Sequence, residues 1–244
     1  MTVKEHYDKH LGNFYSWMTG DFESGQNEFQ KFLKVNAVLP SSTKSAIDLG
    51  AGHGLQSIPL ALLGFNVTAV DFSIPLLEEL KFKCLEYGGL EIEILNEDIK
   101  NVRQFADKRP ELIICCGDTI SHLENKDELA CFIKDISETV IPGGKVLLSF
   151  RDYTKELTGD QRFIHVKSDD NRILTCILDY EKEHVRVTDL LYEKNETGWE
   201  QKISSYKKIR VFPYEIKEML AANNLKIQIK SEFRGMNTLL AVKI

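Results

Sequence analysis

The 244-residue chain contains no apolar run near the roughly 20 residues that a membrane-spanning helix needs. It also lacks an excess of basic residues, because 31 Lys and Arg face 37 Asp and Glu and give a formal net charge of −6. Binding along a phosphate backbone normally needs a basic face, so a nucleic acid is a poor candidate partner. The opening MTVKEHYDKH is polar and lacks the apolar stretch of a secretion signal. These absences predict a cytoplasmic protein that binds neither membranes nor nucleic acids.

Cysteine is scarce and shows no regular spacing. The five cysteines are an odd number, two of them are adjacent, and no Cys-x-x-Cys pair occurs. A disulfide framework or a zinc site needs paired or regularly spaced cysteines. We therefore predict reduced cysteines that act as small core side chains, and no metal site.

The composition is that of a folded protein with a charged surface. Hydrophobic residues make up 43% of the sequence and charged residues 28%, which is enough for a sizeable core and excludes disorder for most of the chain. At this length we expect one large α/β domain, or one such domain with a cap.

Strand-like and helix-like segments alternate from residue 28 to residue 150. The expected strands are short apolar runs bounded by Gly, Pro or polar residues, at 46–49, 65–70, 91–95, 111–116 and 145–150. Helical patterns lie before or between them, at 28–39, 54–63, 75–87 and 127–140. This alternation predicts an α/β fold with a doubly wound, mostly parallel sheet. Such sheets bind ligands at the carboxyl ends of their strands, near the point where the strand order reverses.

After residue 151 the pattern changes to successive strands separated by polar turns. The runs at 163–166, 173–180, 185–192 and 199–211 predict a small antiparallel insert, followed by a helix at 214–222 and strands at 225–229 and 238–242. We therefore expect four regions. They are an N-terminal helical lid (1–40), a cofactor-binding α/β core (41–151), an antiparallel β cap (152–212), and a C-terminal helix with the closing strands of the core (213–244).

The sharpest local signal is the segment Asp48-Leu49-Gly50-Ala51-Gly52-His53-Gly54, which follows a predicted strand and precedes a predicted helix. Glycines let the backbone turn tightly and approach a ligand, and a helix N-terminus offers free N–H groups. Asp71 ends the next strand, where an acid about 20 residues beyond the loop can accept hydrogen bonds from both ribose hydroxyls. This order of elements, which is strand, loop, helix, strand and acid, predicts a site for a nucleoside-containing cofactor.

The glycine spacing distinguishes between cofactors. A dinucleotide fingerprint reads G-x-G-x-x-G, but the sixth position counted from Gly50 is Leu55. The sequence instead reads G-x-G-x-G after Asp48, which resembles motif I of the class I S-adenosylmethionine-dependent methyltransferases. The resemblance covers residues 45 to 150 well. It implies S-adenosyl-L-methionine as the cofactor and a Rossmann-like, seven-stranded, mostly parallel sheet with an antiparallel closing strand.

The resemblance continues in the loops after later strands. Asn96-Glu97-Asp98-Ile99 is similar to the family segment whose acid faces the adenine amino group, and Pro142-Gly143-Gly144-Lys145 to the turn before the fifth strand. The resemblance implies that Asp48 lies near the methionyl ammonium and Asp71 at the ribose. The full set of implied cofactor contacts is Tyr7, Tyr15, Trp17, Asp48, Gly50, Ala51, Gly52, Asp71, Phe72, Asp98, Ile99, Cys116 and His122.

Three segments resemble glycine and sarcosine N-methyltransferase-like enzymes more closely. The segment from Gly117 to Leu123 is similar to their G-N-S-x-x-H-L loop, and the stretch from Tyr15 to Phe29 to their N-terminal lid. Phe150-Arg151-Asp152-Tyr153 is similar to their H-R-N-Y segment, in which the arginine holds a substrate carboxylate, a task that suits a guanidinium fork. The implied catalytic residues are Tyr15, Asp118, His122 and Arg151.

Two positions depart from this group. The lid arginine that meets the cofactor carboxylate falls on Gly25 here, which makes Gln26 a candidate substitute. The loop asparagine is Asp118, whose negative charge favours a cationic or amine acceptor and can take a proton after methylation. These departures argue against a strict glycine N-methyltransferase and leave a small amine, an amino acid or an amino sugar open.

We therefore predict methyl transfer from S-adenosylmethionine to a small soluble metabolite, with nitrogen as the favoured acceptor atom. The alternatives are an O-methyltransferase on the same scaffold, an NAD-dependent oxidoreductase, and a non-catalytic cofactor-binding or RNA-associated module. Leu55 in place of the third glycine argues against the oxidoreductase, and the acidic composition against the RNA-associated module. The sequence determines neither the acceptor nor the oligomeric state.

Overall fold

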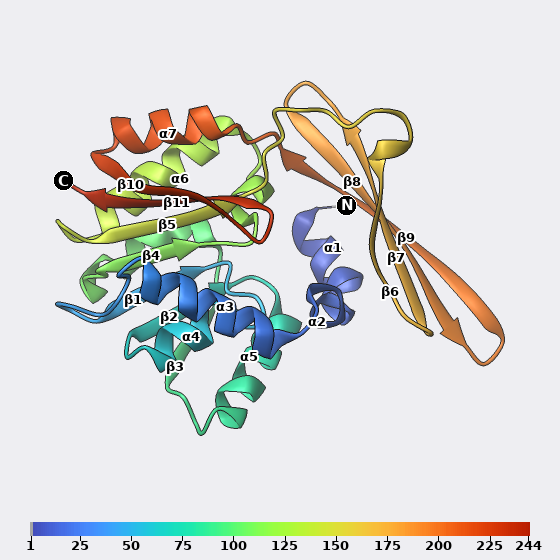
Figure 1. The fold of residues 1–244 in the computed structure, drawn as a ribbon, viewed down its shortest axis with the longest axis horizontal. Helices are drawn as coiled ribbons and strands as arrows, with labels where there is room; N and C mark the ends of the chain where they lie inside the picture. Colours follow the sequence, from blue (N-terminus) through green and yellow to red (C-terminus); the bar gives the residue numbers. More distant parts are fainter. Residues whose placement is uncertain (1) are drawn as a thin grey trace.

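Two β-sheets organise residues 2–244, the part of the chain that the computed structural model describes. The larger sheet forms a core with helices on both faces, the smaller one stands beside it, and the N-terminal helices lie between the two (Figure 1). Within residues 2–244, none of the helices combines the length and the apolar character needed to cross a membrane.

The larger sheet has seven strands in the order β10-β11-β5-β4-β1-β2-β3. Its parallel strands are β1 (Ser45–Leu49), β2 (Asn66–Asp71), β3 (Ile92–Asn96), β4 (Leu112–Cys115) and β5 (Lys145–Phe150). β11 (Met236–Lys243) runs antiparallel to both β5 and β10 (Leu225–Phe233). The predicted sheet and its antiparallel closing strand are thus confirmed. The strand order reverses between β1 and β4, and that reversal marks the ligand-binding edge of such sheets.

Helices bury both faces of this sheet. One face is covered by α3 (Phe22–Val35), α4 (Ser57–Leu62) and α5 (Ile74–Glu86), and the other by η2 (Ile99–Lys108), α6 (Lys126–Thr139) and α7 (Pro213–Ala222). The inner strands consequently need apolar side chains on both sides, as in neighbouring Leu112 and Ile113, which are almost fully buried in different clusters. The carboxylate of Asp21 caps α3 by accepting a hydrogen bond from Ser24 N at 3.0 Å.

The smaller sheet is the predicted antiparallel insert. Its strands follow one another in space as in sequence: β6 (Phe163–Ser168), β7 (Arg172–Tyr180), β8 (His184–Asn195) and β9 (Gly198–Ile209). Buried Val185, Val187 and Leu191 alternate with more exposed residues along β8, as expected for a sheet with one covered face. We call this sheet the cap.

The short helices α1 (Val3–Lys9), η1 (Leu11–Asn13) and α2 (Tyr15–Thr19) pack against the cap. Leu11 and Phe14 form an apolar cluster with Leu174 and Leu191 of the cap. α3 differs, because its Phe29 and Leu33 pack into the core. The predicted lid, residues 1–40, thus contains short helices packed against the cap and one helix of the core.

Some details differ from the sequence-based expectations. η2, between β3 and β4, was not predicted, because its buried residues Ile99, Val102 and Phe105 are scattered through a polar stretch. β10 and β11 are longer than predicted and leave only a two-residue turn, Arg234-Gly235. The prediction of core cysteines is wrong for Cys131, which is exposed on the outer side of α6.

Candidate active site

The loop after β1 has glycine where backbone and space require it. Gly50 and Gly54 adopt φ of +81° and +93°, values that other residues rarely adopt. A Cβ on Gly50 would lie 2.5 Å from Thr119 Cγ2, and one on Gly54 would lie 2.3 Å from Leu80 Cδ1. Gly50 thus lets the loop after β4, which carries Thr119, press against the loop after β1.

Asp71 is held rigidly at the end of β2. Its Oδ2 accepts a hydrogen bond from Gly52 N at 2.8 Å, and its Oδ1 accepts one from Ser73 N at 2.8 Å. Burial raises the pKa of this carboxyl, while the hydrogen bonds from Ser73 and Gly52 oppose the rise. A carboxylate oxygen can accept more than one hydrogen bond, so Asp71 can still accept bonds from ligand hydroxyls.

Asp48 lies one strand away, at the end of β1, and is almost fully buried. Its Oδ2 accepts a hydrogen bond from Ser57 Oγ at 2.6 Å. Burial raises the pKa of Asp48 to about 7, although the Ser57 hydrogen bond acts in the opposite direction. A positively charged ligand group beside it would favour the ionised form.

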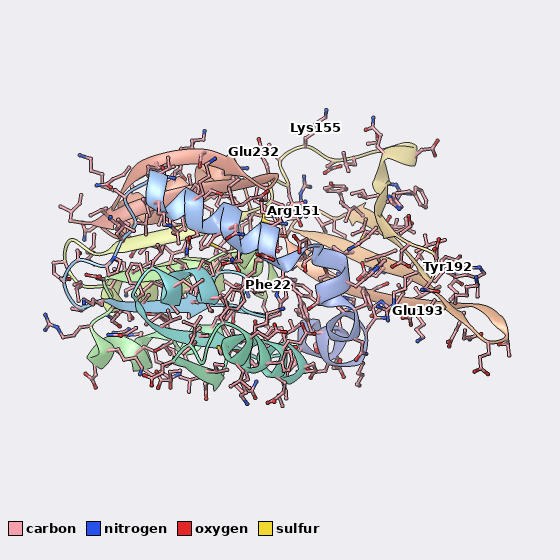
Figure 2. The ribbon with its side chains drawn as sticks, turned by 60° about the horizontal axis from the view of Figure 1, so that its bottom comes forward. Phe22, Arg151, Lys155, Tyr192, Glu193 and Glu232 are labelled. Atoms are coloured by element: carbon pink, nitrogen blue, oxygen red, sulfur yellow. The ribbon has the colours of Figure 1, made fainter. Side chains whose placement is uncertain are left out.

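Asp118 joins the core to the cap. Its Oδ1 accepts a hydrogen bond from Arg151 N at 2.9 Å, and its Oδ2 accepts bonds from Tyr153 OH at 3.0 Å and Lys208 Nζ at 2.8 Å. Burial by itself would raise the pKa of Asp118, but Lys208, together with the hydrogen bond from the Arg151 backbone, opposes it and the pKa is lowered. The carboxylate is therefore ionised and already has donors on both oxygens. The side chain of Arg151 is exposed and lies between the core and the cap (Figure 2).

Aromatic side chains from several elements close over this edge of the sheet. Tyr7 packs edge-on against Phe72 and His122, at ring distances of 5.5 Å and 5.7 Å. Tyr15 lies over the glycine loop, because a Cβ on Gly52 would be 3.9 Å from Tyr15 Cε1. Burial, followed by the charge of Lys208, lowers the pKa of His122 to about 3, so this imidazole is neutral.

The structure adds a buried group that no sequence signal indicated. His6 Nδ1 lies 2.7 Å from Ser204 Oγ, and His6 Nε2 lies 3.2 Å from Asp189 Oδ2. The His6 ring also stacks on Tyr206, with ring centroids 4.1 Å apart. These contacts attach α1 to β8 and β9 of the cap. The residues come from distant parts of the chain, and only the docking of α1 on the cap brings them together.

Comparison with known proteins identifies the core. Residues 46–144 match a family profile described as a methyltransferase domain. This segment of the chain is thus a methyltransferase domain. This match decides against the NAD-dependent oxidoreductase that the sequence left open, while a closer relation to the glycine and sarcosine enzymes is not established.

Curated relatives match only part of this chain. The ubiquinone biosynthesis O-methyltransferase of Rickettsia felis is 32% identical over 110 residues, covering 45% of this chain and 42% of the relative. The putative methyltransferase YqeM of Bacillus subtilis is 29% identical over 113 residues, covering 46% of this chain and 44% of the relative. The chain thus matches less than half the length of either relative.

Solved structures match nearly the whole chain, cap included. An S-adenosylmethionine-dependent methyltransferase from Clostridium acetobutylicum covers 97% of this chain and 96% of its own, with a TM-score of 0.74 and 20% identity. The CcbJ methyltransferase from Streptomyces caelestis covers 93% and 98%, with a TM-score of 0.75 and 18% identity. At these identities the likeness establishes the fold.

Not every residue predicted for the methyltransferase site lies at the glycine loop. Trp17 Nε1 donates to Asp169 in the turn between β6 and β7, so this side chain faces the cap. Ile99 packs into the core, and Asp98 is exposed and caps η2 by accepting a hydrogen bond from Lys100 N at 2.9 Å. Burial raises the pKa of the Cys116 thiol to about 12, so it stays protonated. The roles of individual residues in binding or catalysis stay predictions.

The residues at this edge fit S-adenosylmethionine. Two buried side-chain atoms near the edge have no hydrogen-bond partner within residues 2–244, namely Ser73 Oγ and His122 Nδ1. Buried polar atoms without partners are costly, so a polar ligand among them is favourable. Asp48 and Asp71 add carboxylates suited to an ammonium and to ribose hydroxyls.

Proposed function

We propose that the protein transfers a methyl group from S-adenosylmethionine to a small-molecule acceptor held between the core, the N-terminal helices and the cap. The observation that carries this proposal is the polar cradle formed by Gly52 and Asp71, with Tyr15 beside Gly52 and Tyr7 packed on Phe72, the residue after Asp71. In this arrangement Asp71 accepts hydrogen bonds from the ribose hydroxyls, and Asp48 lies beside the methionyl ammonium. When bound, S-adenosylmethionine supplies an electrophilic methyl group on a sulfonium centre.

The contribution of the acceptor side is orientation and exclusion of water. Tyr7, Tyr15, Phe72, His122 and Tyr206 form a nearly continuous aromatic wall that limits how an acceptor can approach. Holding two reactants in line lowers a barrier without any acid or base, and this effect can reach several kcal/mol. We propose α1, η1 and α2 as the lid and residues 152–212 as the cap of this acceptor site.

We further propose nitrogen as the acceptor atom. A neutral amine attacks with its own lone pair, whereas a hydroxyl must lose its proton as it reacts. Two polar groups predicted for catalysis, His122 and Asp118, are poor proton acceptors. His122 has a pKa lowered to about 3, and both oxygens of Asp118 already accept hydrogen bonds. An amine that arrives neutral needs neither group as a base.

O-methylation is the second candidate, and the curated relatives favour it. Several of those relatives are named ubiquinone biosynthesis O-methyltransferases, and their similarity covers between 42% and 58% of this chain. Solved structures named as an amino pentose methyltransferase and a sugar N-methyltransferase share the fold over at least 93% of the chain, at 13% and 15% identity. Neither likeness identifies the acceptor, because one scaffold carries many substrates.

Calorimetric titration of the purified protein with S-adenosylmethionine, and separately with NADH, tests the cofactor. We expect binding of S-adenosylmethionine alone. Asp71→Ala should weaken it by about 1–3 kcal/mol, because the ribose hydroxyls lose their partner. Asp107→Ala, which removes an exposed acid on η2, is the matched control. Binding of NADH alone would overturn the proposed function, and unchanged binding by Asp71→Ala would overturn the ribose assignment.

A second experiment separates nitrogen from oxygen. The protein is incubated with S-adenosylmethionine and with matched acceptor pairs that differ only in an amino or a hydroxyl group, including amino sugars and amino acids. Mass spectrometry identifies the methylated atom. We expect product from the amino member of a pair, and methylation of only the hydroxyl members would establish the second candidate instead.

A further inference from the structure

An arginine side chain occupies the space beside Gly25 where another residue would carry its own side chain. A Cβ on Gly25 would lie 2.7 Å from Arg234 Nη1, 3.5 Å from Arg234 Cζ and 3.0 Å from Leu55 Cδ1. Gly25 is buried in the first turns of α3, whereas Arg234 forms the tip of the β10–β11 hairpin. The guanidinium therefore lies between α3 and the segment that follows the glycine loop.

The positive charge of Arg234 also reaches the glycine loop itself. Burial is the main reason that the pKa of His53 falls to about 4 and that of Tyr15 rises to about 12, and the charge of Arg234 acts on both groups. His53 belongs to the glycine loop and packs edge-on against Tyr15, with ring centroids 5.3 Å apart. Arg234 thus lies within electrostatic range of the glycine loop and of Tyr15 in the lid.

Little in the protein neutralises this charge. The acid paired with Arg234 within residues 2–244 is Glu28, whose Oε2 lies 3.8 Å from Arg234 Nε, too far for a hydrogen bond. Both side chains are substantially exposed, at 36% for Arg234 and 56% for Glu28, and such pairs contribute little. Arg234 also adopts φ of +51°, an uncommon conformation for a residue with a side chain, at the tip of the hairpin.

We infer that Arg234 binds the carboxylate at the methionyl end of S-adenosylmethionine, an inference that rests on the proposed function. A guanidinium offers N–H donors in a fork that matches a carboxylate. Gln26, the substitute suggested by the sequence, fits this role poorly, because its Nε2 donates to Asn27 and the atom left without a partner is the acceptor Oε1. The arginine that binds the ligand carboxylate therefore comes from the β10–β11 hairpin, and Gly25 leaves space for its side chain.

Two ligands that differ only in the methionyl end test the inference by calorimetry. S-adenosylhomocysteine carries the carboxylate, whereas 5′-methylthioadenosine retains the nucleoside and lacks the amino-acid portion. Arg234→Gln should raise the Kd for S-adenosylhomocysteine about 10- to 100-fold and leave the Kd for methylthioadenosine within about 2-fold. Arg103→Gln, which changes an exposed arginine on η2, is the matched control, and Arg234→Lys should restore part of the loss.

A transposed pair of substitutions provides a second test. Gly25→Arg together with Arg234→Gly moves the guanidinium onto α3 and removes the closest contact that a side chain at position 25 would meet, leaving Leu55 Cδ1 at 3.0 Å from its Cβ. We expect this double variant to bind S-adenosylhomocysteine more tightly than Arg234→Gly alone. Unchanged affinity in Arg234→Gln, or an equal loss for both ligands, would overturn the inference. Failure of the unaltered protein to bind either ligand would instead overturn the proposed function, and the inference with it.

Discussion

On the core side of the site, Asp48, Gly52 and Asp71 come from two adjacent strands and the segment between them. On the cap side, Asp118 meets Tyr153 and Lys208, which lie 35 and 90 residues further along the chain. The core side is thus built by local turns within one βαβ unit, and the cap side by docking of an insert. The comparison shows that local turns can build one side of a site while docking of a distant segment builds the other.

The two sides also differ in how their acids are neutralised. Asp48 and Asp71 accept hydrogen bonds from hydroxyl and amide groups, and burial raises the pKa of both. Asp118 accepts a hydrogen bond from Lys208, which lowers its pKa in spite of burial. The core-side acids therefore gain from a cationic or hydroxyl-bearing ligand, whereas the cap-side acid has its partner within the fold.

Lys208→Met tests the largest expected effect, the loss of the ion pair between core and cap. It leaves Asp118 buried without its counter-charge, which should reduce the free energy of unfolding by about 3–5 kcal/mol at pH 8. In the unaltered protein the folded pKa of Asp118 is below its ordinary value of 3.8, so its stabilisation is present above that pH and is lost as the pH falls through the folded pKa.

Urea unfolding of Lys208→Met and of the unaltered protein at pH 8 measures this effect. Lys207→Met, which removes the neighbouring exposed lysine paired with Glu181, is the control and should change stability by less than about 1 kcal/mol. Equal losses in the two variants would show that the buried pair is no more important than a surface pair.

Asp48→Asn should have the opposite effect on stability. Folding raises the pKa of Asp48 from 3.8 to about 7, so the folded state favours the protonated carboxyl. The stability that this group contributes to the folded protein is fully present below pH 3.8 and is lost as the pH rises through about 7. The neutral amide avoids that loss, and the variant should gain roughly 2–4 kcal/mol at pH 8 but little at pH 4. Thermal unfolding at both pH values measures the gain.

The same variant should bind S-adenosylhomocysteine more weakly, because the ligand ammonium loses an anionic partner. Calorimetry at pH 8 checks this second effect. A variant that is stabilised and binds as before would show that Asp48 is not a cofactor contact, and a variant destabilised at pH 8 would contradict the pKa argument.

Arg151→Ala should have the smallest effect on stability, within about 0.5 kcal/mol, because its side chain is exposed and Asp118 binds only its backbone N–H. If Arg151 holds an acceptor carboxylate, KM for a carboxylate-bearing acceptor should rise about tenfold or more while cofactor affinity stays constant. Steady-state kinetics and calorimetry measure the two effects. Lys155→Ala, an exposed residue of the same connection toward the cap, is the control (Figure 2). Equal loss of acceptor and cofactor binding would make Arg151 structural.

The core was predictable because its signals are local. β1 and β4 are apolar runs bounded by turn residues, and each meets helices on both faces. The predicted strand at 145–150 coincides with β5, and the cap strands differ only at their ends. η2 was missed because its apolar spacing lies in a polar stretch. The full length of the β10–β11 hairpin was missed because its turn, Arg234-Gly235, has arginine at the position where Asn, Asp or Gly is usual.

Local sequence was sufficient for the glycine loop and Asp71, since positive φ angles and the strand-to-acid spacing depend on residues close together in the chain. Folding of the whole chain was needed to bring Arg234 to Gly25, Lys208 to Asp118 and His6 to Asp189. Charge pairing and close packing act through space, and they leave no periodic pattern along the chain. The glycine loop and its acid can therefore be read from a short motif, while the surroundings of Arg234 and Asp118 depend on how the hairpin, cap and lid pack.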